Sequence, residues 1–145
     1  MPRAVPLTRN HFQLFREIPT RWMDVDIYGH VNNVEYLSYF DTAVNGWLIE
    51  EGVLDPRNSE TVFLVVETQC AYFAELTFPG TVTAGIRVSR LGGSSVSYEI
   101  ALFADESETA SAQGRFVHVQ VDRSTRRPVP VEGERRDLLA TILQG

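Results

Sequence analysis

The residues of this chain best suited to chemistry lie in a short stretch between residues 24 and 33. Asp26 offers a carboxylate, which can act as a general base or as a nucleophile. His30 and Asn32 follow it, and Asn32 is a suitable residue to begin a helix. The free backbone N–H groups and the positive dipole end of a helix start favour an anion, including a transition-state oxyanion. The stretch therefore predicts an acid beside a site that could stabilise an oxyanion.

The same residue types also have a structural interpretation. Asp opens turns and Asn caps helices without any catalytic role. Residues 26–29, Asp-Ile-Tyr-Gly, have Asp at the first and Gly at the fourth position of a type I turn. His30 could hydrogen-bond the backbone and hold that turn in place. Both interpretations predict a sharp turn that leads directly into a helix.

The elements on either side of the turn must position these side chains. Before the turn, the alternation of residues 22–26 predicts a strand that ends at Asp26. After the turn, Asn32 and Glu35 have the spacing of a capping box, and Gly52 can end the helix that follows. The turn is thus expected to join a strand to the longest helix of the chain.

One face of this helix is expected to be buried. Apolar residues recur there at helical spacing, namely Val34, Leu37, Phe40, Val44, Trp47 and Leu48. Asp41 falls within the same stripe, where a carboxylate needs a partner. Asp41 is therefore the second candidate for a catalytic acid, although pairing with a polar neighbour would also explain it.

The remaining chain predicts strands joined by short turns. A first strand begins near Phe12, and the last strand is followed by a short helix within residues 131–143. The strands after the long helix are expected at residues 61–73, 81–90, 94–104 and 110–122. Residues 61–73 are too apolar for an exposed strand, whereas residues 1–10 are expected to be a mobile lead-in. Runs of strands with one segregated helix indicate an α+β fold with an antiparallel sheet.

Composition narrows the class of protein further. The chain has 145 residues, enough for a single domain over residues 1–145, and 43% of them are hydrophobic. Its net charge of −6 argues against nucleic-acid binding, and it has no apolar run long enough to predict a membrane span. Cys70 is the single cysteine, so a cysteine metal cluster is excluded, and a cytoplasmic location is expected. Every basic residue is Arg, which excludes lysine Schiff-base chemistry.

A longer motif surrounds the candidate acid. It reads Asp24-x-Asp26-x-x-Gly29-His30-Val31-Asn32-Asn33, followed by Tyr36-Leu37-x-Tyr39-Phe40. It resembles the opening motif of the hotdog-fold acyl-CoA thioesterases, in the subgroup typified by 4-hydroxybenzoyl-CoA thioesterase. The run His-Val-Asn-Asn also resembles the plant acyl-ACP thioesterases, although Tyr28 stands where those enzymes carry Asn. The resemblance implies a curved antiparallel sheet of about five strands wrapped around one long helix.

The resemblance also implies an activity and a set of site residues. It implies hydrolysis of a thioester to a free carboxylic acid and CoA, with Asp26 as the general base or nucleophile and His30 in a catalytic role. The oxyanion hole would be formed by backbone amides at Val31, Asn32 and Asn33. Contacts to the substrate are expected from Tyr28 and from a turn near the CoA pantetheine and phosphates, at Arg90, Gly92, Ser94 and Ser95. A Gly-Gly hairpin would explain that turn without any ligand.

Partners and alternatives follow from the same resemblance. The substrate would be an acyl-CoA or an acyl-carrier thioester, with no cofactor beyond the CoA of the substrate and no metal. Two subunits would join their sheets in a homodimer or homotetramer, which would cover an otherwise open sheet edge. Hydration or dehydration of enoyl-thioesters and non-catalytic acyl-CoA binding are the alternatives, since a fold does not determine a function.

Overall fold

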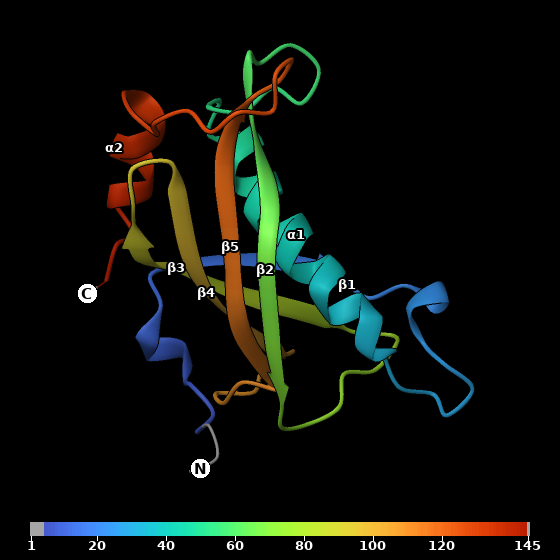
Figure 1. Cartoon of the computed structure of the whole chain (residues 1–145). Helices are drawn as coiled ribbons and strands as arrows, with labels where there is room; N and C mark the ends of the chain where they lie inside the picture. Colours follow the sequence, from blue (N-terminus) through green and yellow to red (C-terminus); the bar gives the residue numbers. More distant parts are fainter. Residues whose placement is uncertain (1–4, 145) are drawn as a thin grey trace.

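The computed structural model of the chain describes residues 5–144, in which a curved antiparallel sheet wraps around one long helix (Figure 1). The five strands lie in the order β1-β3-β4-β5-β2, and every neighbouring pair is antiparallel. Their bounds are β1 (Leu14–Pro19), β2 (Thr61–Tyr72), β3 (Thr81–Leu91), β4 (Ser95–Ala104) and β5 (Ala112–Asp122). The predicted α+β class and strand order along the chain are confirmed, as is the arrangement that the hotdog resemblance implies.

The long helix α1 (Asn33–Glu50) begins and ends where its sequence predicts. The side chain of Asn32 accepts a hydrogen bond from the Val34 N–H at 3.2 Å, which caps the helix start. Gly52 follows the last turn with a φ of +77°, a conformation that favours glycine. The structure shows no capping-box bond from Glu35, whose carboxylate instead lies 3.5 Å from the Arg21 guanidinium. The single cap is therefore sufficient to define the start.

The buried face of α1 differs in part from the predicted stripe. It consists of Tyr36, Tyr39, Phe40, Ala43, Val44, Trp47 and Leu48. Val34 is 68% exposed, and Asp41 is also exposed, with its carboxylate bonded to the Asn45 side chain at 2.8 Å. Tyr36 and Tyr39 lie on this face instead of Val34, and their hydroxyl groups have hydrogen-bond partners inside the protein. Asp41 consequently lies outside the apolar stripe.

Alternate residues of the central strands form the inner face of the sheet. Those of β3 and β4 are fully buried, as their period-two pattern predicts. They are Val82, Ala84, Ile86 and Val88 on β3, and Val96, Tyr98, Ile100 and Leu102 on β4. On β5, Phe116, His118 and Gln120 are buried as well. These residues and the buried face of α1 form the main core.

Strand β2 lies at one edge of the sheet and is exposed within one chain, so the prediction that it would be covered depends on a partner. Residues 64–69 are all exposed, and Val66 is 58% exposed at an irregularity in the pairing with β5. The strand pairs with β5 on one side only, so the backbone groups on its other side are left open to another chain. Within one chain, nothing described covers this apolar edge.

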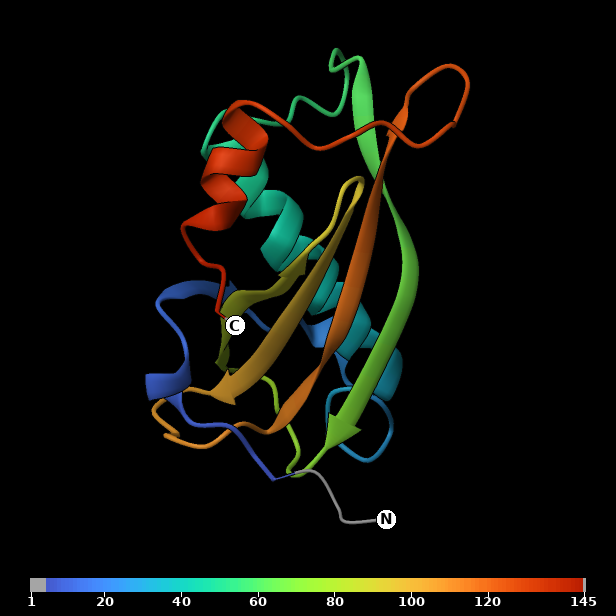
Figure 2. The same cartoon turned by 60° about the vertical axis from the view of Figure 1, so that its left-hand side comes forward.

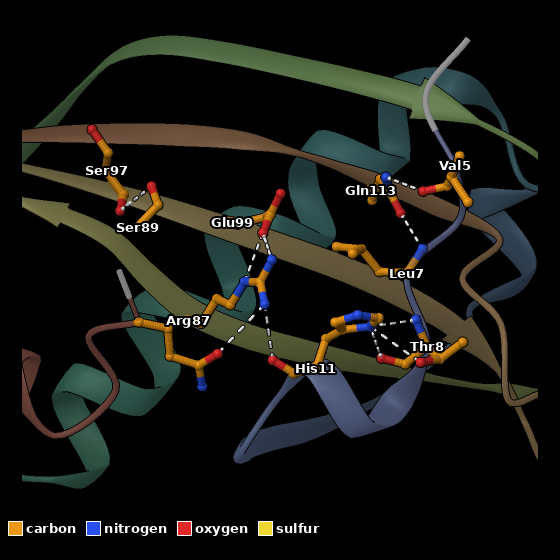
Figure 3. A network of polar contacts seen from close by, with 10 residues as sticks. Val5, Leu7, Thr8, His11, Arg87, Ser89, Ser97, Glu99 and Gln113 are labelled. Atoms are coloured by element: carbon orange, nitrogen blue, oxygen red, sulfur yellow. Dashed lines mark hydrogen bonds and ion pairs between the residues drawn. The ribbon is translucent and has the colours of Figure 1, made fainter. Parts of the chain in front are cut away.

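The segment before β1 is ordered from residue 5 onward, which corrects the expectation of a mobile lead-in there; residues 1–4 lie outside the described residues. The Gln113 side chain accepts from the Leu7 N–H at 2.7 Å and donates to the Val5 carbonyl at 3.0 Å. Figure 3 shows this segment against the sheet, where the Arg87 guanidinium donates hydrogen bonds to the Glu99 carboxylate and to the His11 carbonyl. Hydrogen bonds between side chains and the backbone thus order a segment whose sequence shows no regular pattern of apolar residues.

The remaining short elements frame the sheet. Residues Trp22–Asp24 form a 3₁₀ helix rather than the predicted strand, because the Asp24 carboxylate folds back onto the Arg21 N–H at 2.8 Å. Helix α2 (Glu134–Ala140) is the predicted terminal helix. None of the helices within residues 5–144 is long and apolar enough to cross a membrane.

Candidate active site at the start of helix α1

The turn before α1 positions the Asp26 carboxylate. The Gly29 N–H donates to the Asp26 carbonyl at 3.1 Å, and Gly29 has a φ of +82°, so the predicted turn and its glycine are confirmed. The Tyr28 N–H donates to Oδ1 of Asp26 at 2.9 Å, which holds the carboxylate in one orientation. Oδ2 has no hydrogen-bond partner within residues 5–144. One carboxylate oxygen is therefore fixed, while the other is available.

Asp24, the other acid of the motif, is fully buried and serves the structure. Its carboxylate accepts from the Arg21 backbone and guanidinium and from the Tyr39 hydroxyl at 2.8 Å. Burial alone would raise the pKa of Asp24, but the hydrogen bonds from Arg21 and Tyr39 outweigh it and hold that pKa below its usual value. The Asp24 carbonyl also accepts from the Asn32 N–H at 2.8 Å. Asp24 thus anchors the helix start.

A pocket of about 410 Å³ brings most of the predicted site together. Its lining includes Asp26, Tyr28, His30, Val31 and Asn33, all of which were predicted as site residues. Asn32 is absent from the lining because its side chain caps the helix. The rest of the wall comes from α1 and from the end of β2 with the segment that follows it, at Tyr36, Tyr72, Phe73, Ala74 and Glu75.

The backbone amides at the helix start are not equally available, which narrows the predicted oxyanion hole. The Val31 N–H donates to the Leu76 carbonyl, and the Asn32 N–H donates to the Asp24 carbonyl, each at 2.8 Å. The Asn33 N–H has no partner among the described residues and belongs to a pocket-lining residue at the positive end of α1. Because a donor already in a bond cannot stabilise new charge, Asn33 is the amide of this segment that can bind an oxyanion.

His30 is paired with a residue that sequence reasoning missed. Its Nε2 lies 3.0 Å from Oε2 of Glu75, while its Nδ1 is buried and has no partner among the described residues. Glu75 is brought there by an antiparallel bridge between His30 and Thr77 and by the neighbouring bond to the Leu76 carbonyl. No local spacing relates residues so far apart in sequence, so the motif alone could not have found this pair.

Two tyrosines form the apolar wall of the pocket. The rings of Tyr36 and Tyr72 pack edge to face with centroids 5.0 Å apart. Burial raises the pKa of both hydroxyl groups, that of Tyr72 to about 12, so each stays protonated at neutral pH. The Tyr36 hydroxyl oxygen accepts from the Leu76 N–H at 3.2 Å.

The second predicted group, Arg90, Gly92, Ser94 and Ser95, lies elsewhere. It occupies the turn between β3 and β4, at the opposite end of β3 from Thr81, which pairs with Pro19 shortly before the site. Figure 2 shows α2 and this turn at the same end of the molecule, and the Arg136 guanidinium donates to the Gly92 carbonyl at 3.0 Å. Within one chain this turn is not part of the pocket, and its contact with CoA stays a prediction.

Comparisons with known proteins relate the sequence and the fold of this chain to those of others. A model of the thioesterase-like superfamily matches residues 20–140. The PA5185 protein of Pseudomonas aeruginosa is 51% identical, with a TM-score of 0.93 over 96% of this chain and 97% of that one. A 1,4-dihydroxy-2-naphthoyl-CoA thioesterase of Synechocystis shares the fold at 17% identity, with a TM-score of 0.78 over 87% of this chain and 94% of that one. The YsmA protein of Bacillus subtilis is 24% identical over 90% of this chain and 88% of its own length.

Proposed function

Because the chain belongs to the thioesterase-like superfamily and is a thioester hydrolase with the hotdog fold, we propose that it hydrolyses acyl-CoA or acyl-carrier thioesters. The products are a free carboxylic acid and CoA or the carrier thiol. The observation that carries this proposal is the arrangement around Asp26. Its available carboxylate oxygen shares one pocket with the free Asn33 N–H at the start of α1.

The chemistry assigns different tasks to these groups. Asp26 either takes a proton from the attacking water or attacks the carbonyl carbon itself to give a mixed anhydride that water then opens. In both routes a C–O bond forms and the C–S bond breaks, while the Asn33 N–H stabilises the charge on the carbonyl oxygen. The leaving thiol has an ordinary pKa of about 8.5, so it departs with little help from an acid. Water is the only other reactant, and no cofactor is required.

His30 and Glu75 support this chemistry from the side of the pocket. Oε2 of Glu75 lies 3.0 Å from Nε2 of His30, which leaves Nδ1 as the ring nitrogen without a partner among the described residues. An imidazole held in this way can pass a proton between the attacking water and the leaving sulfur. Glu75 therefore acts as a positioning residue for His30.

The exposed edge of β2 supports a homodimer. Two copies related by a two-fold axis would pair residues 64–69 with each other as antiparallel strands and cover Val65 and Val66. Tyr72, which lines the pocket, would then lie beside the first half of the partner's β2. The partner would thus complete the acyl-binding side of the site.

Release of free thiol from a panel of acyl-CoAs tests this function. The panel contains short, medium and long aliphatic acyl groups and aromatic ones, and the assay compares wild type with Asp26→Asn. The Asn side chain keeps the turn but removes the base, so kcat should fall by at least about 10²-fold. Asp41→Asn is the matched control, because Asp41 is an exposed carboxylate outside the pocket.

Two results would contradict the proposal. The substrate class is wrong if wild type releases thiol from no member of the panel. The role of Asp26 is wrong if Asp26→Asn is folded and keeps more than about a tenth of wild-type kcat. Such a loss of less than about tenfold would be smaller than the loss of about 10²-fold that is the least expected on removing a general base.

A further inference from the structure

The Tyr36 side chain has an unusual position in the pocket. Tyr36 follows Asn33 by one helical turn, so the two residues lie on the same side of α1. Its side chain is only 3% exposed, yet it lines the pocket that contains Asp26. A buried phenol in this pocket places a polar group in the same wall as the rings of Tyr72 and Phe73.

The hydrogen bonds of this hydroxyl group are incomplete. Its oxygen accepts from the Leu76 N–H at 3.2 Å, but its own hydrogen has no acceptor among residues 5–144. A hydroxyl group has one hydrogen to donate, and buried donors are almost always paired. By contrast, the Tyr39 hydroxyl one turn further on donates to the Asp24 carboxylate at 2.8 Å. Of these two tyrosines of α1, the one that lines the pocket is therefore the one with an unused donor; the Tyr98 hydroxyl on β4 also lacks a partner among the described residues, but it lies outside this pocket.

The surroundings keep this donor protonated and in place. Burial raises the pKa of Tyr36 above its ordinary value, so the phenol carries its proton at neutral pH. The ring is held on one side by Tyr72, with centroids 5.0 Å apart, and its oxygen is held by the Leu76 N–H. A donor fixed in advance is the kind that stabilises developing charge most effectively, because little reorganisation is needed.

We propose that the Tyr36 hydroxyl donates a hydrogen bond to the thioester carbonyl oxygen, as a second oxyanion donor alongside the Asn33 N–H. Tyr36 is then a catalytic residue, because it contacts the reacting carbonyl. This inference rests on the proposed function, and it explains why a tyrosine occupies this buried position. A solely structural Tyr36 would tie α1 to the Leu76 segment and make no contact with substrate.

The test compares Tyr36→Phe with Tyr39→Phe as a matched control. Each change removes one buried hydroxyl group and one hydrogen bond from α1, but only Tyr36 lines the pocket. Loss of an oxyanion donor typically lowers kcat by about 10²–10³-fold, so Tyr36→Phe should lose about that much with little change in KM. Tyr39→Phe, assayed where circular dichroism shows it folded, should stay within about threefold of wild type, since it lies outside the pocket.

A binding measurement separates contact with the carbonyl from a structural role. The probes are two unreactive CoA derivatives of equal length: an S-alkyl thioether without a carbonyl, and a ketone with a methylene between the carbonyl and sulfur. Tyr36→Phe should weaken binding of the ketone by about three- to tenfold, as expected for one hydrogen bond, and should leave the affinity for the thioether within about twofold of wild type. Equal weakening of both probes would show that Tyr36 acts only through the structure.

The outcomes also distinguish this inference from the proposed function. An active wild type whose Tyr36→Phe variant keeps kcat within about threefold overturns the role of Tyr36 and leaves the thioesterase assignment intact. A wild type that releases thiol from no acyl-CoA overturns both. A selective loss of kcat and of ketone binding in Tyr36→Phe supports the inference.

Discussion

His118 should make the stability of the protein depend on pH. It lies on the inner face of β5 and is 1% exposed, among the rings of Phe63, Tyr98 and Phe116. Burial lowers its pKa to about 4. None of these rings carries a negative charge, and Arg135 lies on the ring of Phe63 with its own positive charge. The imidazole is therefore neutral in the folded protein at neutral pH.

The direction and size of the effect follow from the two pKa values. In the unfolded chain His118 takes up a proton near its ordinary pKa of about 6.5, whereas in the folded protein it does so only near 4. Between these values the unfolded state binds more protons, so the free energy of unfolding falls as the pH falls. From pH 7 to pH 4.5, this single group should lower the free energy of unfolding by about 2 kcal/mol.

Urea unfolding of wild type and His118→Gln at these two pH values measures the effect. Gln cannot titrate, so the free energy of unfolding of this variant should fall by about 2 kcal/mol less than that of wild type over the interval, whatever its own stability at pH 7. The protein concentration must be the same throughout, because association would add to the apparent stability. All other acids and histidines are shared by the two proteins and cancel in the difference.

Equal pH dependence in the two proteins would refute this reasoning. It would mean that His118 is protonated in the folded state near its ordinary pKa. A difference of opposite sign, with wild type more resistant to acid than His118→Gln, would mean that the folded protein stabilises the imidazolium.

Three further predictions concern the site and the assembly. Glu75→Gln removes the carboxylate charge beside His30, and steady-state kinetics should show a fall in kcat of about tenfold, which is less than the loss of about 10²–10⁴-fold expected on removing the base itself. An unchanged kcat would exclude a positioning role for Glu75. Asp24→Asn removes the charge of a buried, hydrogen-bonded carboxylate and should lower the free energy of unfolding in urea by about 1–3 kcal/mol, whereas Asp41→Asn at an exposed position should change it by less than about 0.5 kcal/mol. Equal effects of the two substitutions would contradict the anchoring role of Asp24. Val66→Lys places a charge on the open edge of β2 and should convert a dimer to a monomer in light scattering; a wild type that is already monomeric would contradict the assembly.

Much of the fold could be predicted because its signals are local. The turn at residues 26–29, the Asn32 cap and the alternating strands each depend on neighbours within a few residues. Two predictions were wrong because a side chain forms hydrogen bonds that the sequence pattern does not indicate. Asp24 folds back onto Arg21, so the expected strand becomes a 3₁₀ helix, and Gln113 fixes a segment that has no periodicity of its own.

Only part of the candidate site could be predicted from the sequence, because the rest depends on contacts that residue types and spacing do not specify. Asp26, His30 and Asn33 lie in one motif, and the structure brings them into one pocket. Which helix-start amide is free depends on carbonyl groups at Asp24 and Leu76, and the motif contains no information about either contact. The role of Glu75 likewise depends on pairing between segments far apart in the chain, which residue types and spacing do not specify.

The short connection from β2 to the site imposes a constraint on chain length. Strand β2 ends at Tyr72, and within the next few residues Glu75 contacts His30 while Leu76 bonds to both Val31 and Tyr36. Successive residues of an extended segment point to opposite sides, so adding or removing one residue here would turn the carboxylate away from the imidazole. Homologues that keep this site can therefore vary the side chains of Phe73 and Ala74, but not the number of residues between Tyr72 and Leu76.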